Sequence, residues 1–218
     1  RTRAPERTAQ GTPQGEEERL RDALATASAE LGDLIARSAD ENAQSIIEFQ
    51  VAMLEDVTFV APAFTAIANG AAADDAWRSA LDAHIRDYED AEDAYFRARA
   101  SDLRDMRDRV LRCLGGAPAA PVPLGVIVIA ADLAPSRFLE ISWTGGGIAL
   151  FDGSTTSHLA TLARARGVPM IVGMTHAELP AHGDALLDAD LGVLVASPDR
   201  QAAALFEAQR DAVRGQLG

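Results

Sequence analysis

A histidine that follows a run of glycine and hydroxyl residues is the feature of this sequence best suited to chemistry. The run reads DGSTTSH and ends at His158. The apolar residues 148–151 before it are typical of a strand, and we expect a helix to begin around Ser157, supported by Thr156 as its N-cap. His158 would then lie in the first helical turn at the carboxyl end of a sheet strand, where α/β folds place their ligands.

A phosphoryl group is the ligand that this position favours. The free N–H groups and the positive dipole end of a helix start attract phosphate, and the same field favours the neutral, nucleophilic form of an imidazole. Gly153 would allow a bulky donor to approach closely. Hydroxyl groups that could hydrogen-bond the phosphoryl oxygens belong to Ser154, Thr155 and Ser157. A histidine near a helix start is, however, more often a surface or capping residue, so these residues alone leave both interpretations open.

Strands and helices alternate in the carboxyl-terminal part of the chain, which predicts an α/β domain over residues 117–197. Its first strand is a continuous, β-branched apolar run, as expected for a strand that is buried on both faces. The predicted strands lie at 125–133, 147–151 and 169–173, and a hairpin centred near Asp190 follows them.

The amino-terminal part has the periodicity of helices and predicts a helical subdomain over residues 16–116. Its apolar residues recur at helical spacing in about four segments, which suggests a bundle or paired hairpins. Pro62 is expected in the first turn of one helix and Gly70 at its end. Residues 1–15 have the composition of a flexible lead-in, and residues 198–218 predict a carboxyl-terminal linker helix.

Composition excludes two classes of partner. The net charge is −13 and all 20 basic residues are arginine, whereas nucleic acid calls for clustered basic residues, so we expect no nucleic-acid binding. No run approaches the ~20 apolar residues of a membrane-spanning helix, so we expect no membrane association. The single cysteine, Cys113, provides no disulfide framework and fits the reducing cytoplasm, where we expect the protein to act.

The negative charge is concentrated in the helical part. Residues 16–114 contain 22 acidic residues against 11 arginines, whereas residues 117–218 are nearly balanced. One interpretation is a solvated acidic surface that favours solubility. The other is a docking face for a basic partner, which such a charge would steer towards the helices.

Three short motifs form a series around the histidine. Residues 153–158 read GSTTSH, Ala163-Arg164 follows, and residues 169–173 read PMIVG. This series resembles the phosphohistidine site of the phosphoenolpyruvate-utilising enzymes, whose pattern is Gly-Gly-x-Thr-Ser-His, then Ala-Arg and a Pro-x-Ile-Val-Gly strand. The resemblance implies that His158 is the phosphorylated residue, through its Nε2 atom.

The helical part resembles one member of that family, enzyme I of the bacterial sugar phosphotransferase system. Residues 45–59 are similar to its helix ending in Leu-Leu-Glu-Asp, residues 95–116 to its Ala-Ala-Asp-Val-Arg-Asp helix, and residues 126–136 to its strand and Thr-Pro-Ser turn. The resemblance covers roughly residues 16–218. It implies an all-α subdomain of about four helices, which binds the phosphocarrier protein HPr, packed with an α/β phosphohistidine (swivelling) domain.

The resemblance also implies the direction of transfer and the partners. His158 would accept phosphate that originates from phosphoenolpyruvate and pass it to HPr. The positions that match the family's HPr-binding residues are Glu41, Gln50, Met53, Leu54, Asp56, Arg99 and Asp102. In the family a carboxyl-terminal barrel binds phosphoenolpyruvate and Mg²⁺, and such a barrel needs ~250 residues. We therefore expect this chain to hold no cofactor or metal and to be unable to use phosphoenolpyruvate alone.

Several positions depart from the family pattern. Ser154 and Thr155 replace a glycine and an arginine of the motif, and Phe138 stands where a threonine beside the histidine is expected. Val57 and Thr58 replace acidic residues of the docking helix. The barrel and the family's opening strand are also missing from the sequence. Two alternatives stay open: an enzyme I-like portion of a multiphosphoryl carrier that feeds dihydroxyacetone kinase, and a non-catalytic partner-binding module.

The other histidines suggest no second site. His176 and His182 lie near Glu178 and Asp184 and could be imagined as metal ligands with them. Their segment has the composition of a solvated loop before the hairpin, and that interpretation is favoured. His84 is expected on the surface of a helix. We predict no metal site.

Overall fold

The computed structural model describes residues 11–38, 40–116, 122–175 and 183–216. Contacts within the chain divide it into two units. The helical unit consists of Arg1–Pro121 and Ala134–Ile141, and the α/β unit consists of Val122–Leu133 and Ser142–Gly218. The fold class expected from the sequence, helices followed by an α/β domain, is confirmed.

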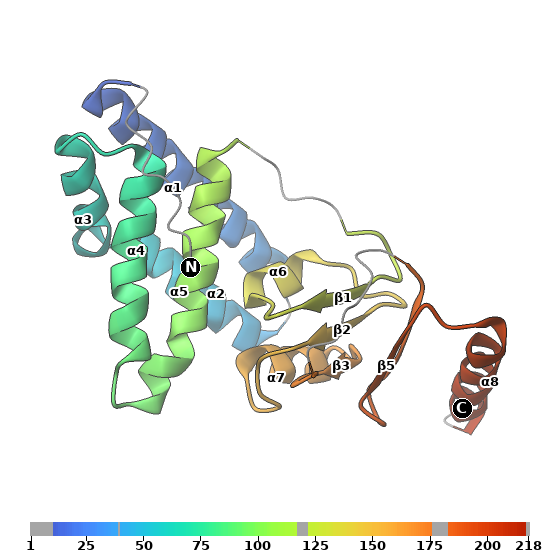
Figure 1. The fold of residues 1–218 in the computed structure, drawn as a ribbon. Coiled ribbons are helices and arrows are strands. Elements are labelled where there is room, and N and C mark those ends of the chain that lie inside the picture. The colour runs from blue at the N-terminus through green and yellow to red at the C-terminus, as the bar shows by residue number, and fades with distance from the viewer. Residues whose placement is uncertain (1–10, 39, 117–121, 176–182, 217–218) are drawn as a thin grey trace. The chain divides into compact units, whose positions relative to one another are not determined.

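Six helices make up the described part of the helical unit (Figure 1). They are α1 Pro13–Arg37, α2 Glu41–Glu55, α3 Val57–Ala68, α4 Ala73–Glu89, α5 Ala94–Leu114 and α6 Pro135–Glu140. Five of them fall in the part of the chain for which about four helices were predicted. Residues 73–114 hold two of these helices, α4 and α5, with a break at 90–93.

Asp56 divides one apolar stretch into α2 and α3. Its Oδ1 accepts hydrogen bonds from the backbone N–H groups of Thr58 at 2.8 Å and Phe59 at 3.4 Å. Asp56 is thus the N-cap of α3 and satisfies amide groups that have no partner inside the helix. The prediction that Pro62 lies in the first turn is wrong, because the cap at Asp56 starts the helix earlier and leaves Pro62 in its interior.

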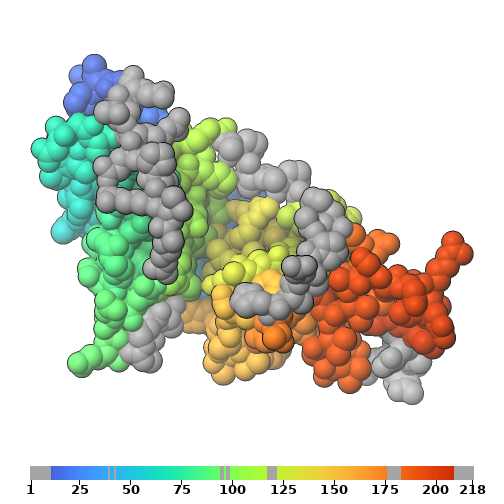
Figure 2. Space-filling model, viewed as in Figure 1, coloured from blue at the N-terminus to red at the C-terminus, as the bar shows by residue number. Residues whose placement is uncertain are grey.

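The helices of this unit enclose one apolar core. Its largest fully buried side chains include Trp77, Leu20, Leu31, Ile47, Ile67, Leu81, Leu103 and Met106. Burying one such aliphatic side chain stabilises the fold by ~1.5–3 kcal/mol. Trp77 also donates from Nε1 to the carbonyl oxygen of Arg107 at 3.1 Å, which joins α4 to α5. In the space-filling view the side chains of α3 and α4, coloured cyan to green, pack beside one another (Figure 2).

Helix α6 belongs to the helical unit, although the sequence placed it in the α/β domain of residues 117–197. Ser136 and Phe138 of α6 are both fully buried. The Oγ of Ser136 donates to Oδ1 of Asp105 at 2.8 Å and accepts from Nη2 of Arg109 at 2.8 Å. These bonds join α6 to α5 across a long stretch of sequence, a contact that no local periodicity reveals.

The described part of the α/β unit contains a three-stranded parallel sheet and a separate hairpin (Figure 1). The sheet has the order β1-β2-β3, with β1 Ile127–Ala130, β2 Gly147–Leu150 and β3 Met170–Ile171. Helix α7 His158–Ala165 lies between β2 and β3 in the chain. Strands β4 Ala185–Asp188 and β5 Val193–Ala196 form the antiparallel hairpin, and α8 Arg200–Gln216 follows. The predicted strands, hairpin and final helix are confirmed.

Strand β2 is the central element of this unit. All four of its residues are buried, as expected for the middle strand of a parallel sheet. A Cβ atom on Gly147 would lie 2.5 Å from Cδ2 of Leu187 in β4 and 3.0 Å from the carbonyl oxygen of Pro169. A side chain at this position would displace the end of the Leu187 side chain and crowd the backbone at Pro169. The loop that follows β2 thus emerges from a strand that is paired on both sides.

No single helix in the described ranges is both long enough and apolar enough to cross a membrane. The bent pair of Ala43–Glu55 and Val57–Ala68 passes this test of length and composition only when the two helices, at 48° to each other, are taken together. Apolar side chains of this pair, Ile47 and Ile67 among them, are buried in the core of the helical unit.

Candidate functional site

The loop that carries the predicted phosphoryl site is anchored where it leaves β2. The backbone N–H groups of Phe151 and Asp152 donate to two consecutive carbonyl groups at the end of β1, at 3.0 and 2.9 Å. On the other side of β2, the N–H of Met174 donates to the carbonyl oxygen of Leu150 at 3.1 Å. The loop therefore starts at a fixed point at the carboxyl ends of the parallel strands, where α/β folds place their ligands.

Residues 153–157 form a turn that its own polar groups close. Gly153 has a φ of +98°, a left-handed conformation that a residue with a Cβ adopts only with strain. The N–H of Thr156 donates to Oγ of Ser154 at 3.0 Å, and Oγ1 of Thr156 lies 2.7 Å from the same oxygen. The N–H of Ser157 donates to the carbonyl oxygen of Ser154 at 3.1 Å. The turn leads directly into α7.

The N-cap of α7 is Ser157, not Thr156 as predicted. Ser157 has an extended backbone, and its Oγ accepts from the N–H of Ala160 at 3.2 Å. A cap residue directly precedes the first helical residue, and α7 begins at His158. Thr156 lies one position too early, and its hydroxyl pairs with Ser154 instead.

His158 is the first residue of α7, so its predicted place in the first helical turn is confirmed. Its side chain is exposed, and residues 153–156 are exposed as well. Leu159 and Ala160 are buried, so the helix is anchored directly behind the exposed histidine. A helix start gathers N–H groups that attract anions. The arrangement therefore places an accessible nucleophile beside an anion-attracting backbone.

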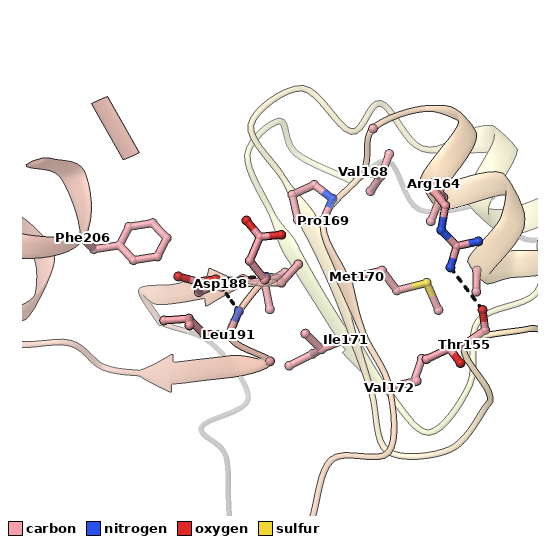
Figure 3. Close-up of a pocket in the computed structure, with 17 residues that line it drawn as sticks. Thr155, Arg164, Val168, Pro169, Met170, Ile171, Val172, Asp188, Leu191 and Phe206 are labelled. Atoms are coloured by element: carbon pink, nitrogen blue, oxygen red, sulfur yellow. Dashed lines mark hydrogen bonds between the residues drawn. The ribbon is translucent and has the colours of Figure 1, made fainter. Parts of the chain in front are cut away.

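Arg164 reaches this loop from the last turn of α7. Its Nη2 donates to the carbonyl oxygen of Thr155 at 3.3 Å (Figure 3). Arg164 belongs to the Ala163-Arg164 motif of the sequence, but no contact was predicted for it. The signal that could have pointed to the contact is that long side chains on a helix lean towards its amino-terminal end.

A cavity of about 860 Å³ adjoins the loop within the α/β unit (Figure 3). One wall is the apolar segment 168–172, which contains β3, and another is the hairpin turn 187–192. Phe206 of α8 faces these walls, and Thr155 and Arg164 also line the cavity, whereas His158 is not among its lining residues. The cavity thus adjoins the loop at Thr155, while the His158 side chain is exposed to solvent.

The structure corrects three of the seven residues predicted to bind a partner. Gln50 and Asp102 are fully buried in the helical unit, and Leu54 is 4% exposed. Nε2 of Gln50 donates to Oδ2 of Asp105 at 3.0 Å, and Asp102 pairs with Nη1 of Arg99 at 3.0 Å. Because all three side chains are buried, Leu54 in the apolar core and the other two in hydrogen bonds, they have no surface to offer a partner.

The other four predicted partner residues do have surface. Glu41 and Asp56 are exposed, and Met53 and Arg99 are half-buried. Val57, next to Asp56, is 78% exposed. The segment where α2 meets α3 therefore presents the Asp56 carboxylate and an apolar side chain to solvent, whereas Glu41 lies at the other end of α2. The role of these residues in docking stays a prediction.

Phe138, which stands where the family's threonine is expected, is fully buried in the helical unit. A phenyl ring has no hydroxyl to donate or accept a hydrogen bond. This chain therefore lacks that hydrogen bond, and the donors around a phosphoryl group must come from other residues.

No group of three His, Cys, Asp or Glu side chains among the described residues could hold a metal ion. His176, Glu178 and His182 lie outside the described residues. His84, expected at the surface, is half-buried, and its ring stacks on that of Phe59 with 4.4 Å between the centroids. Its setting is that of a packing residue.

Two family models match the chain. One is described as the N-terminal domain of PEP-utilising enzymes and matches residues 2–99. The other is described as the mobile domain of PEP-utilising enzymes and matches residues 122–192. The second match includes β2, the loop and all of α7 with His158.

Curated relatives cover most of this chain. A phosphoenolpyruvate-protein phosphotransferase of Cupriavidus necator is 34% identical over 203 residues, which are 84% of this chain and 34% of that protein. A multiphosphoryl transfer protein of Rhodobacter capsulatus is 31% identical over 179 residues, which are 78% of this chain and 21% of that protein. The chain thus spans about a third or less of the length of these relatives.

The fold is shared with a solved structure. A solution NMR structure of enzyme I superposes with a TM-score of 0.73 at 22% identity, over 98% of this chain and 91% of that one. At this identity the likeness concerns the fold alone. The two family matches together cover residues 2–99 and 122–192, so the chain belongs to the PEP-utilising enzymes, of which it contains the N-terminal and mobile domains.

Proposed function

We propose that the chain is a phosphoryl carrier in which His158 accepts phosphate that originates from phosphoenolpyruvate and passes it to the phosphocarrier protein HPr. The observation that carries the proposal is the exposed imidazole at the first residue of α7, directly after a loop of glycine and hydroxyl residues. The match of this segment to the mobile domain of PEP-utilising enzymes supports it. We place the reaction in the cytoplasm, which the single cysteine fits.

For the transfer, this chain must supply a nucleophile and must position the phosphoryl group. The lone pair of one ring nitrogen of His158, Nε2 in our proposal, forms a bond to phosphorus while the bond from phosphorus to the donor breaks. Donor and acceptor approach in line on opposite sides of phosphorus. The exposed hydroxyls of Ser154 and Thr155 and the amides at the start of α7 are the donors that would hold the phosphoryl oxygens.

Docking of HPr is assigned to α2 and its junction with α3, residues 41–57, which we call the α2–α3 segment. The exposed carboxylates of this segment belong to Glu41, Glu48, Glu55 and Asp56. Carboxylates gathered on one segment attract a basic partner and raise its association rate. Val57, at 78% exposure, adds an apolar contact directly after Asp56.

The phosphoenolpyruvate step is proposed to belong to a barrel domain outside residues 1–218. Mg²⁺ is held by carboxylates together with the oxygens of a phosphorylated substrate. The described residues contain no group of three acidic, His or Cys side chains that could hold such an ion, so the donor set does not fit it here. We therefore expect this chain alone to exchange phosphate with HPr and not to use phosphoenolpyruvate.

The direct test runs the exchange backwards, from phosphorylated HPr to the chain. HPr that carries a radiolabelled phosphoryl group should label residues 1–218 without phosphoenolpyruvate or Mg²⁺. The label should be lost in acid and kept in base, as expected for a phosphohistidine, and peptide mass spectrometry should place it on His158. A chain that stays unlabelled, or whose label survives acid, contradicts the proposal.

Removing acidic charge from the α2–α3 segment should slow the association with HPr. The variant carries Glu41→Gln, Glu55→Gln and Asp56→Asn, and the asparagine keeps an N-cap acceptor for α3. We expect its association rate at low salt to fall about tenfold, because electrostatic steering raises such rates by roughly 10–10³. Stopped-flow mixing with HPr measures the rate.

The control removes the same amount of charge from another helix. Glu18→Gln, Asp22→Asn and Asp33→Asn alter three exposed side chains of α1. The difference between the two variants should disappear at high salt, because the screening length falls from ~10 Å at 0.1 M to ~3 Å at 1 M ionic strength. Equal rates for the two variants at low salt would place the partner elsewhere.

A second candidate function is the enzyme I-like portion of a multiphosphoryl carrier that feeds dihydroxyacetone kinase. The 31% identity to a multiphosphoryl transfer protein favours it. His158 would have the same role, but its partner would be an HPr-like domain of the same native protein. Labelling by that domain and not by free HPr would support this candidate. A chain labelled by neither would be a partner-binding module without transfer activity.

A further inference from the structure

The side chain of Arg164 links the two ends of α7 (Figure 3). Arg164 lies in the last turn of this helix, and its Nη2 donates to the carbonyl oxygen of Thr155 at 3.3 Å. Thr155 precedes the first residue of the helix, His158, by three positions. The bond therefore runs from the carboxyl end of the helix back to the loop that leads to the histidine.

The hydrogen bonds within the loop itself are local. Oγ of Ser154 accepts from the N–H of Thr156 at 3.0 Å, and the carbonyl oxygen of Ser154 accepts from the N–H of Ser157 at 3.1 Å. These bonds join residues two or three positions apart, so they close the turn without fixing it against the helix. The bond from Arg164 joins residues nine positions apart and fixes the Thr155 carbonyl against α7.

Arg164 also brings positive charge to a place where negative charge would gather. A phosphoryl group carries about −1.5 to −2 charge near neutral pH, and the exposed Asp152 lies at the start of the same loop. An arginine guanidinium stays protonated and offers several N–H donors, of which the bond to Thr155 uses one. The cation therefore lies beside the loop that is expected to receive the phosphoryl oxygens.

We propose that Arg164 is a positioning residue for phosphoryl transfer: it holds residues 153–157 in the shape that receives the phosphoryl group and offsets the negative charge that arrives on His158. This inference rests on the proposed function of His158. Arg164 acts through Thr155 and through its field, so its loss slows transfer and does not abolish it. Removing one donor from a buried oxyanion site costs roughly 10²–10³ in rate. For this exposed, solvent-screened site we expect about tenfold.

The test compares three variants in the transfer of radiolabelled phosphate from phosphorylated HPr. Arg164→Gln removes the charge, Arg164→Lys keeps it, and Arg166→Gln removes the same charge from another exposed arginine of the same segment. We expect Arg164→Gln to lower the maximal transfer rate about tenfold, with an unchanged half-saturating concentration of phosphorylated HPr and an unchanged unfolding temperature. Arg164→Lys should recover most of the rate, and Arg166→Gln should stay within about twofold of the unchanged chain.

The outcomes separate this inference from the function on which it rests. If the unchanged chain takes up no label, the proposed function of His158 fails. If it is labelled and Arg164→Gln is as fast as Arg166→Gln, only the role of Arg164 is overturned. An Arg164→Lys variant as slow as Arg164→Gln would also overturn it, because the positive charge at the loop would then not account for the transfer rate. An Arg164→Gln variant with a much lower unfolding temperature would overturn it as well, because the slower transfer would then follow from lost stability.

Discussion

The His158→Ala variant is expected to take up no phosphoryl group from phosphorylated HPr, while its free energy of unfolding stays within ~0.5 kcal/mol of that of the unchanged chain. Transfer is lost completely because the imidazole is the covalent carrier itself. Stability is kept because the His158 side chain is exposed at the start of α7, so its removal empties no cavity. Label counting and urea unfolding measure the two effects on the same preparation.

Two matched variants separate the loss of the nucleophile from the loss of local structure. Ser157→Ala removes the oxygen that accepts from the N–H of Ala160 and should cost ~1 kcal/mol, but the chain should still be labelled. His84→Asn removes another imidazole, one that packs on Phe59, and should also leave labelling intact. A His158→Ala chain that unfolds would show that this histidine is structural, and one that still takes up label would show that another residue carries the phosphate.

Strand β2 could be predicted because burial on both faces requires an unbroken apolar run, and GIAL is such a run. The run IVIA also predicts a strand, but the expected burial of both its faces is wrong, because β1 is an edge strand whose four residues are half-buried. The break between α2 and α3 could not be predicted. Asp56 fits the exposed face of a continuous helix as well as it fits an N-cap, and only its bonds to the amides of Thr58 and Phe59 decide between the two. The same cap explains why Pro62 was placed in the wrong turn.

The place of His158 could be predicted because a glycine and several hydroxyl residues between an apolar strand and an amphipathic segment leave few other arrangements. Its contact partners could not. The bond from Arg164 to Thr155 depends on how one long side chain is folded back along the helix, which no spacing in the sequence specifies. Thr156 and Ser157 are both good caps, and the choice depended on where the helix begins.

The partner face shows the limit of carrying residues over by position. A motif match predicts the type of residue at a position but not whether its side chain is buried. Polar residues on helices are mostly exposed, yet Gln50 and Asp102 are buried and are paired with Asp105 and Arg99, respectively. The bond from Gln50 to Asp105 joins α2 to α5, which are far apart in the sequence, so helical periodicity does not reveal it.

The largest stability effect is expected from Asp105, which holds α6 against the helical unit. Its carboxylate accepts from Oγ and N–H of Ser136 at 2.8 and 3.1 Å and from Nε2 of Gln50 at 3.0 Å. Burial raises the pKa of Asp105, and the bonds from Gln50 and Ser136 and the charge of Arg109 oppose this. Asp105 is 8% exposed and Arg109 6%. Solvent therefore reaches these charges very little, and they are stabilised mainly by their interactions with other groups of the cluster.

The stability of this cluster depends on pH, because Arg109 also pairs with Glu30 and Glu140, two carboxyl groups that titrate. The pH of the unfolding measurement therefore matters. The hydrogen bond from Arg112 lowers the pKa of Glu30, against the effect of burial. Burial alone would raise the pKa of Glu140, but the bond from Arg137 and the charge of Arg109 outweigh it and lower the pKa. A carboxyl group whose pKa is lower in the folded chain stabilises the fold above its unfolded pKa near 4.5, and this stabilisation is lost as pH falls through the folded value. At neutral pH both contributions are fully present.

At that pH, Asp105→Ala is expected to lower the free energy of unfolding of the helical unit by about 3–5 kcal/mol, the cost of removing one partner from a buried charged cluster. The substitution leaves two donors of Ser136 and one of Gln50 without their acceptor and Arg109 without its nearby carboxylate. The matched control is Asp108→Ala on the same helix, whose side chain is 64% exposed and pairs with Arg107. It should cost no more than ~1 kcal/mol, as solvent-exposed ion pairs do. Urea unfolding followed by circular dichroism measures both, and equal losses for the two variants would mean that the Asp105 cluster does not hold α6 in place.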